Sequence, residues 1–256
     1  MLELARALAG SCRSLIPGGR HRWQLLALVM VGAAIPLTEL MVAKIFTEII
    51  TKERVSELTH LAPQLALFVL LFLATRVAHY AQRTYRVTFF EAVFRSSDRT
   101  HPPHIESWQW ALGLELVNVL TSLTQMLAMA AYFVVLAPMF GMVNLLLVAV
   151  LAEALGRLFT RQQAKQRSYV ELGRAKEHVA THLRVRSRVV SAEVGGLISS
   201  LGALTLLIAL LAMSINDLIS ASTTIVLFLG LRLQNSTFST LSGGVMRFAR
   251  ARANSY

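Results

Sequence analysis

The sequence predicts an all-α membrane protein with six transmembrane helices, several of which extend far out of the membrane on one side. Five stretches of the chain contain no acidic or basic residue, and one of them is 37 residues long, enough for two crossings of about 20 residues each. The mean hydropathy of +0.56 and the 55% of hydrophobic residues exceed those of ordinary soluble domains. The uncharged stretches are 23–38, 61–75, 116–152, 194–216 and 218–231.

The basic residues gather on one side of this topology. Of the 25 Lys and Arg residues, 22 lie in the N-terminal flank, the second and fourth loops and the C-terminal tail. Cytoplasmic loops of membrane proteins are rich in Lys and Arg. We therefore expect a multi-pass protein of the bacterial cytoplasmic (inner) membrane with both termini in the cytoplasm. Anionic membrane lipids then account for the net charge of +11, and we expect no nucleic acid partner.

The first element is expected to be an amphipathic helix that lies in the membrane interface. Five apolar residues alternate with arginines in the first 20 residues, a pattern typical of interfacial helices. The turn 17–19, Pro-Gly-Gly, then leads into the first membrane helix. A cleaved signal peptide is the alternative, but the basic flank is 22 residues long and lacks a plausible cleavage site. The apolar residues are Leu2, Leu4, Leu8, Leu15 and Ile16.

Six long helices are expected to follow, within one membrane domain that covers residues 1–256. A helix over 61–99 would be ~58 Å long at 1.5 Å per residue, about twice the hydrocarbon thickness, so it must project into the cytoplasm. Residues 101–103, His-Pro-Pro, end it. Small residues Gly195, Ser199 and Gly202 predict close helix packing in the fifth span. The predicted helices are 23–46, 61–99, 106–137, 142–188, 190–215 and 218–252.

This organisation resembles the transmembrane domain of ABC exporters. Two segments are similar to the corresponding segments of that family. One is the basic helix that leads from Arg83 past a proline to Glu106. The other is the end of the last helix, 245–252, Val-Met-Arg-Phe-Ala-Arg-Ala-Arg. The resemblance implies that the tips of the two long loops, 101–110 and 173–182, dock on a partner ATPase. The docking residues that it implies are His101, Pro102, His104, Trp108, Trp110, Gly173, Lys176 and His178.

The sequence departs from that family in two respects. The chain ends at Tyr256 and contains no G-x-x-x-x-G-K-[ST] phosphate loop, so we expect no ATPase activity from it and no catalytic residues. Exporters often carry an acidic residue shortly after the first docking segment, whereas Asn118 lies near that position here.

Polar residues in the last helix are the main candidates for a substrate cavity. Arg232, Asn235, Ser239 and Ser242 recur every three or four residues and predict one polar stripe, which lipid cannot satisfy. Arg232 is a candidate anion anchor; the alternative is that it reaches the headgroups.

Other charged residues have simpler interpretations. Glu153 and Arg157, four residues apart, should pair on one face of a helix, either as a structural pair or as part of a substrate path. Glu39 and Lys44 are expected to flank a solvated outer loop.

No cofactor or metal is expected. His178 and His182, and likewise His101 and His104, have spacings seen in metal sites, but no third ligand is fixed by the sequence. The single Cys12 excludes an internal disulfide.

Two functions therefore remain open. The first is a membrane permease subunit for a peptide-like or amphipathic solute, powered by a separate ATPase or an ion gradient. The second is a non-transporting scaffold or regulatory subunit of a larger membrane complex. Half of an exporter-like fold encloses half a cavity, so we expect a homodimer in either case.

Overall fold

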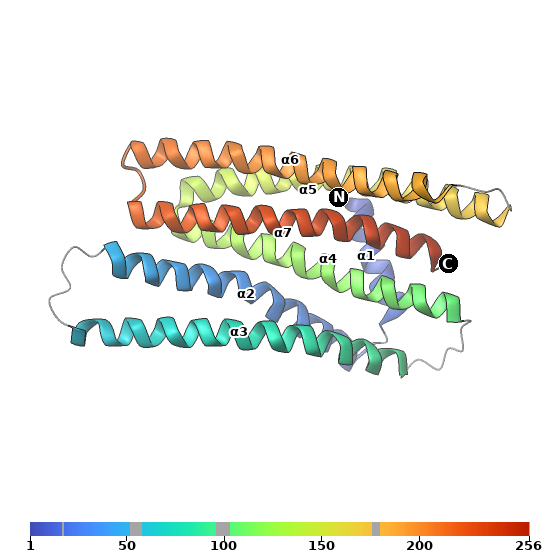
Figure 1. The fold of residues 1–256 in the computed structure, drawn as a ribbon, viewed down its shortest axis with the longest axis horizontal. Coiled ribbons are helices and arrows are strands. Elements are labelled where there is room, and N and C mark those ends of the chain that lie inside the picture. Colours follow the sequence, from blue (N-terminus) through green and yellow to red (C-terminus); the bar gives the residue numbers. More distant parts are fainter. Residues whose placement is uncertain (17, 52–57, 96–102, 176–179, 256) are drawn as a thin grey trace.

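The fold is an elongated bundle of antiparallel helices. The computed structural model describes all residues except 17, 52–57, 96–102, 176–179 and 256, and describes 51, 58–61, 103, 104, 173, 174, 181 and 184 by their backbone only. The turns that join α4 to α5 and α6 to α7 lie at one end of the bundle, here called the turn end, and the C-terminus lies at the other (Figure 1). The described helices are α1 (Leu2–Leu15), α2 (Arg20–Thr51), α3 (Leu58–Arg95), α4 (Pro103–Leu136), α5 (Pro138–Arg174), α6 (Thr181–Ile215) and α7 (Ala221–Asn254).

Five of the described helices, α2 to α6, are long and apolar enough to cross a membrane. This confirms the predicted all-α class and the multi-pass pattern for the first five predicted spans. The sixth predicted span, α7, is equally a long helix but does not reach the same apolarity, because its polar residues begin at Arg232. Six crossings therefore remain a prediction.

Several helix ends differ from those predicted, by the largest margin between the fourth and fifth spans. The helix expected at 142–188 ends at Arg174, and residues 181–188 belong to α6. The charged segment between spans four and five has no apolar periodicity, so the position of the turn could not be predicted from it. Residues 181–194 contain no Gly or Pro, so α6 extends well beyond its apolar part. Helix α4 begins at Pro103, three residues before its predicted start, since proline is tolerated in the first helical turn.

Helix α7 is the centre of the bundle. It contacts α2, α4, α5 and α6, and places Leu227, Phe238 and Phe248 in the core. Near the turn end, α7 packs into an apolar cluster that contains Phe133 and Phe140. A larger apolar cluster packs around it toward the C-terminal end. Contact with four other helices allows α7 to bury the polar residues Gln234, Thr237 and Ser242.

Helices α1 and α3 lie on the outside of this arrangement. Leu4, Leu8 and Ile16 are buried where α1 packs on α4 and α5, so the apolar face predicted for an interfacial helix contacts the bundle. Helix α3 packs along α2 and contacts α4 only slightly. Only 6% of the apolar 18-residue stretch of α3 is buried, so almost the whole surface of α3 away from α2 is exposed.

A proline in the middle of α2 creates a polar group that α4 satisfies. Pro36 has no N–H, so the carbonyl of Gly32 lacks its helical partner. The Gln125 side chain on α4 donates a hydrogen bond to that carbonyl at 2.8 Å. Because lipid offers no donor, this contact fixes α2 against α4 at the level of Gly32.

Replacing Gln125 with Leu should lower the free energy of unfolding by about 1–3 kcal/mol, because the Gly32 carbonyl is then buried without a donor. Pro36→Ala supplies a backbone N–H for the same carbonyl, so Gln125→Leu should cost little in that background. Unfolding of the four proteins in detergent micelles measures this coupling. An equal cost in both backgrounds would contradict the proposed role of Gln125.

Candidate functional site

A pocket of about 330 Å³ opens between α2 and α7. Arg232 lies eleven residues from the start of α7 and Glu39 twelve from the end of α2, so both lie ~16–18 Å from the turn end at 1.5 Å per residue. Both residues therefore lie at a similar level of the bundle, with Lys44 and Glu48 of α2 between Glu39 and the turn end. The pocket is lined by Glu39, Leu40 and Ala43 of α2 and by Leu229, Arg232, Leu233 and Ser236 of α7.

Glu39 has a partner on α3. Its carboxylate lies 3.3 Å from Nε2 of His79, and one residue earlier the Thr75 hydroxyl donates to the Thr38 hydroxyl at 2.9 Å. These contacts join α2 to α3 near the middle of the bundle. Beyond Glu39, α2 continues for three helical turns to Thr51, and the expected outer loop that follows lies largely outside the described residues.

Arg232 has no hydrogen bond or ion pair to any residue that the structure describes, although Glu39 lines the same pocket. Its side chain is exposed on the open side of α7. A cation without a partner would be costly in the hydrocarbon of a membrane.

The open side of α7 changes character along its length. Toward the turn end it presents Ile225, Phe228 and Leu229. From Arg232 onward its exposed residues are polar, and we call them the polar face of α7. They are Arg232, Ser236, Ser239, Thr240, Arg247 and Arg250.

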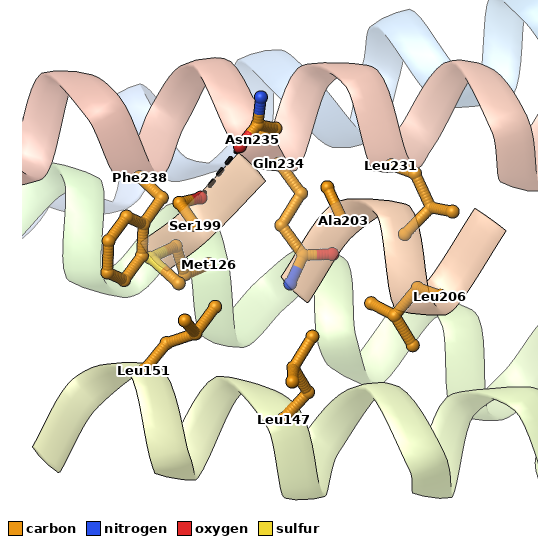
Figure 2. Close-up of a pocket in the computed structure, with 10 residues that line it drawn as sticks. All are labelled: Met126, Leu147, Leu151, Ser199, Ala203, Leu206, Leu231, Gln234, Asn235 and Phe238. Carbon is orange, nitrogen blue, oxygen red and sulfur yellow. Dashed lines mark hydrogen bonds between the residues drawn. The ribbon is translucent and has the colours of Figure 1, made fainter. Parts of the chain in front are cut away.

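The predicted stripe is thus divided between two surfaces. Arg232 and Ser239 lie on the polar face, whereas Asn235 and Ser242 turn toward α6. Ser199 donates to Asn235 at 2.7 Å (Figure 2), and Ser242 is fully buried and donates to the Ala192 carbonyl at 3.1 Å. At about 100° per residue, Asn235 and Ser242 are rotated roughly 60–80° from Arg232, enough to reach a neighbouring helix.

The small residues of α6 make the close contacts predicted for them. A Cβ on Gly195 would clash with the Ser242 hydroxyl, and one on Gly202 would lie 3.0 Å from Leu147. Beside Ser199, Gln234 and Asn235 line a second cavity of about 10 Å³ between α4, α5, α6 and α7 (Figure 2). It has room for about one water molecule, so of these two cavities the α2–α7 pocket is the one with the size of a solute site.

Glu153 and Arg157 pair as predicted, at 3.1 Å. The Glu153 carboxylate also accepts from the amino group of Met1 at 2.9 Å, so it holds the start of α1 against α5. Neither residue lines the two pockets described above. This position favours the structural alternative over a substrate path.

Most of the predicted docking residues lie outside the part of the chain whose side chains are described. His101, Pro102, Lys176 and His178 are outside the described residues, and for His104 and Gly173 only the backbone is described. The two tryptophans are half-buried: Trp110 packs against Phe94 at 5.2 Å between ring centres, and the Arg250 guanidinium lies 5.1 Å from the ring centre of Trp108. These two rings therefore serve packing within the bundle.

A polar network that the sequence did not reveal links three helices toward the C-terminal end. Arg247 of α7 donates to Glu115 of α4 at 2.6 Å. Asn118 donates to the same carboxylate at 3.5 Å and accepts a hydrogen bond from Arg86 of α3.

No protein-family model and no curated protein matches this chain, so its own residues and geometry carry the assignment. Among the described residues no group of three or more His, Cys, Asp and Glu side chains could hold a metal ion. The geometry offers a pocket between α2 and α7 with one unpaired cation, continuous with a polar helix face.

Glu115→Ala should lower the free energy of unfolding by about 1–3 kcal/mol, because Arg247 and Asn118 lose a largely buried acceptor. Glu91→Ala is the matched control: Glu91 pairs with Arg95 at the same 2.6 Å, but both are exposed, so its loss should cost less than about 0.5 kcal/mol. A double-mutant cycle with Arg247→Ala isolates the pairwise energy. Equal effects of Glu115→Ala and Glu91→Ala would refute a structural role for the network.

Proposed function

We propose that this chain is the permease subunit of an exporter-like membrane transporter that moves an amphipathic or peptide-like solute across the cytoplasmic membrane. The polar face of α7 is the observation that carries the proposal. It runs from mid-depth to the C-terminal end on the open side of the bundle, flanked by apolar helices. Lipid cannot satisfy such a face, so water or a solute should cover it.

The same face supports a two-fold dimer. A single chain leaves the polar face of α7 open, and pairing with a second copy would enclose it between two identical walls. In this arrangement α7 crosses the membrane as the sixth span, and the excess of basic residues places the C-terminal end in the cytoplasm. Energy would come from a separate ATPase docked at the loop tips 101–110 and 173–182, or from an ion gradient.

Single cysteines at Ser236, Ser239 and Thr240 should react with a charged, membrane-impermeant maleimide in open membrane vesicles, because water reaches a transport path. Leu201→Cys on α6 is the control: Leu201 is 65% exposed in the bundle, but it should face lipid, so a cysteine there should stay unlabelled. Burial raises the pKa of the native Cys12 thiol, an effect that nearby Arg22 partly opposes, and Cys12→Ser removes its background reaction. Labelling of the Leu201→Cys protein but of none of the α7 variants would exclude a wet path along α7.

Orientation is tested in intact cells. The variants Met139→Cys and Leu218→Cys at the turn end should be labelled from outside, whereas Ser168→Cys and Arg250→Cys should react only after permeabilisation. External labelling of the Arg250→Cys protein would reverse the proposed topology.

Assembly and energy source are tested by purification. Native mass spectrometry of the protein extracted in mild detergent should give a dimer, and an ATPase that co-purifies should be lost when 101–110 or 173–182 is altered. A monomer in detergent and in nanodiscs would contradict the enclosed cavity. A larger complex that collapses on those changes, with no ATPase and no solute flux, would favour the scaffold function.

A further inference from the structure

The geometry points to the α2–α7 pocket as a binding site for an anionic amphiphile: a single apolar chain that ends in a carboxylate or phosphate held by Arg232. This inference rests on the proposed function, in that it names the class of solute that the permease would admit. It can be tested by binding alone.

The first step concerns the positive charge of Arg232, which is not paired within the pocket. Arg232 has no partner among the described residues, and it lies ~16 Å along α7 from the turn end. A guanidinium holds a carboxylate or phosphate through two parallel hydrogen bonds. Binding an anion would thus remove the main electrostatic cost of this position.

The second step is why Glu39 does not already fill that role. Its carboxylate lies 3.3 Å from His79 on α3, and no ion pair joins it to Arg232. Glu39 therefore has a partner and Arg232 does not. A cationic ligand would be repelled by the unpaired Arg232, whereas an anionic ligand would be attracted to it.

The third step is the apolar part of the ligand. Leu40, Leu229 and Leu233 line the pocket around Arg232. Beyond Leu229, Phe228 and Ile225 continue an exposed apolar strip toward the turn end. A head bound at Arg232, with Ser236 one turn away as a hydroxyl donor, would lay its chain along this strip. The volume of about 330 Å³ is at the lower end of small-molecule sites, enough for the head and part of a chain.

The experiment measures binding of radiolabelled dodecyl phosphate to the full chain in phosphatidylcholine nanodiscs. Arg232→Ala should weaken binding at least tenfold, and Arg232→Lys less, because an ammonium lacks the two-pronged geometry. Glu39→Gln should tighten binding about threefold or more by removing a like charge. Arg161→Ala, which removes an exposed cation on α5 outside the pocket, should change nothing.

Competition on the unaltered protein keeps the test independent of how the variants fold. Dodecanoate should displace the probe, whereas dodecanol and dodecylammonium should not. Equal displacement by all three, or full-strength binding to a folded Arg232→Ala protein, would overturn the site. If phosphatidylglycerol in the nanodisc displaces the probe, a membrane lipid is the source of the anion. If the probe stays bound in its presence, the ligand is a free amphiphile. Both results uphold the site.

The two proposals fail separately. Probe binding without water access along the polar face of α7 would leave the anion site and remove the transport path. Water access without probe binding would leave the path and remove the anion site.

Discussion

The rule that lipid offers no hydrogen bonds decides where each polar group of this bundle can lie. Helix α7 packs against four other helices and buries some of its polar side chains, such as that of Ser242, among them. The same rule explains the Gln125 contact to the carbonyl that Pro36 leaves open, and the pairing of Thr75 with Thr38. Gln125, Thr38 and Thr75 thus have protein partners, whereas Arg232 has none among the described residues.

Polar contacts also hold the outermost long helix. Helix α3 shares little surface with anything but α2, and its connections to the rest are directional: His79 to Glu39, and Arg86 to Asn118. The second of these continues through Glu115 to Arg247 on α7. The edge helix is thus tied to the central one through charges rather than through apolar packing, and a change of charge at either end of the network acts on both.

The sequence predicted the helical class, five of the spans and the i, i+4 pair of Glu153 and Arg157, because hydropathy, charge spacing and helical periodicity act along the chain. It could not predict Glu39 with His79 or Glu115 with Arg247, because those pairs depend on which helices touch and in what register. The predicted stripe on α7 depends on both kinds of information. Its spacing along the helix was correct, but a rotation of roughly 60–80° about the helix axis buries Ser242 against α6 while Arg232 remains exposed. The only sign that Glu115 is structural is its position as the last charge before a long uncharged stretch.

The choice between a permease and a scaffold turns on Arg232 and the polar face below it. A subunit that only holds its neighbours in place would be more stable with an apolar residue in the middle of an exposed helix face, since a lone cation there costs free energy and contributes no contact within the chain. A scaffold could still use such a residue if a partner subunit supplied the anion, but then one buried pair would suffice. Here polar residues continue on the same face for several turns toward the C-terminal end, through Ser236, Ser239 and Thr240 to Arg247. A transport path requires a continuous polar face and a single docking contact does not, and on this ground we propose transport.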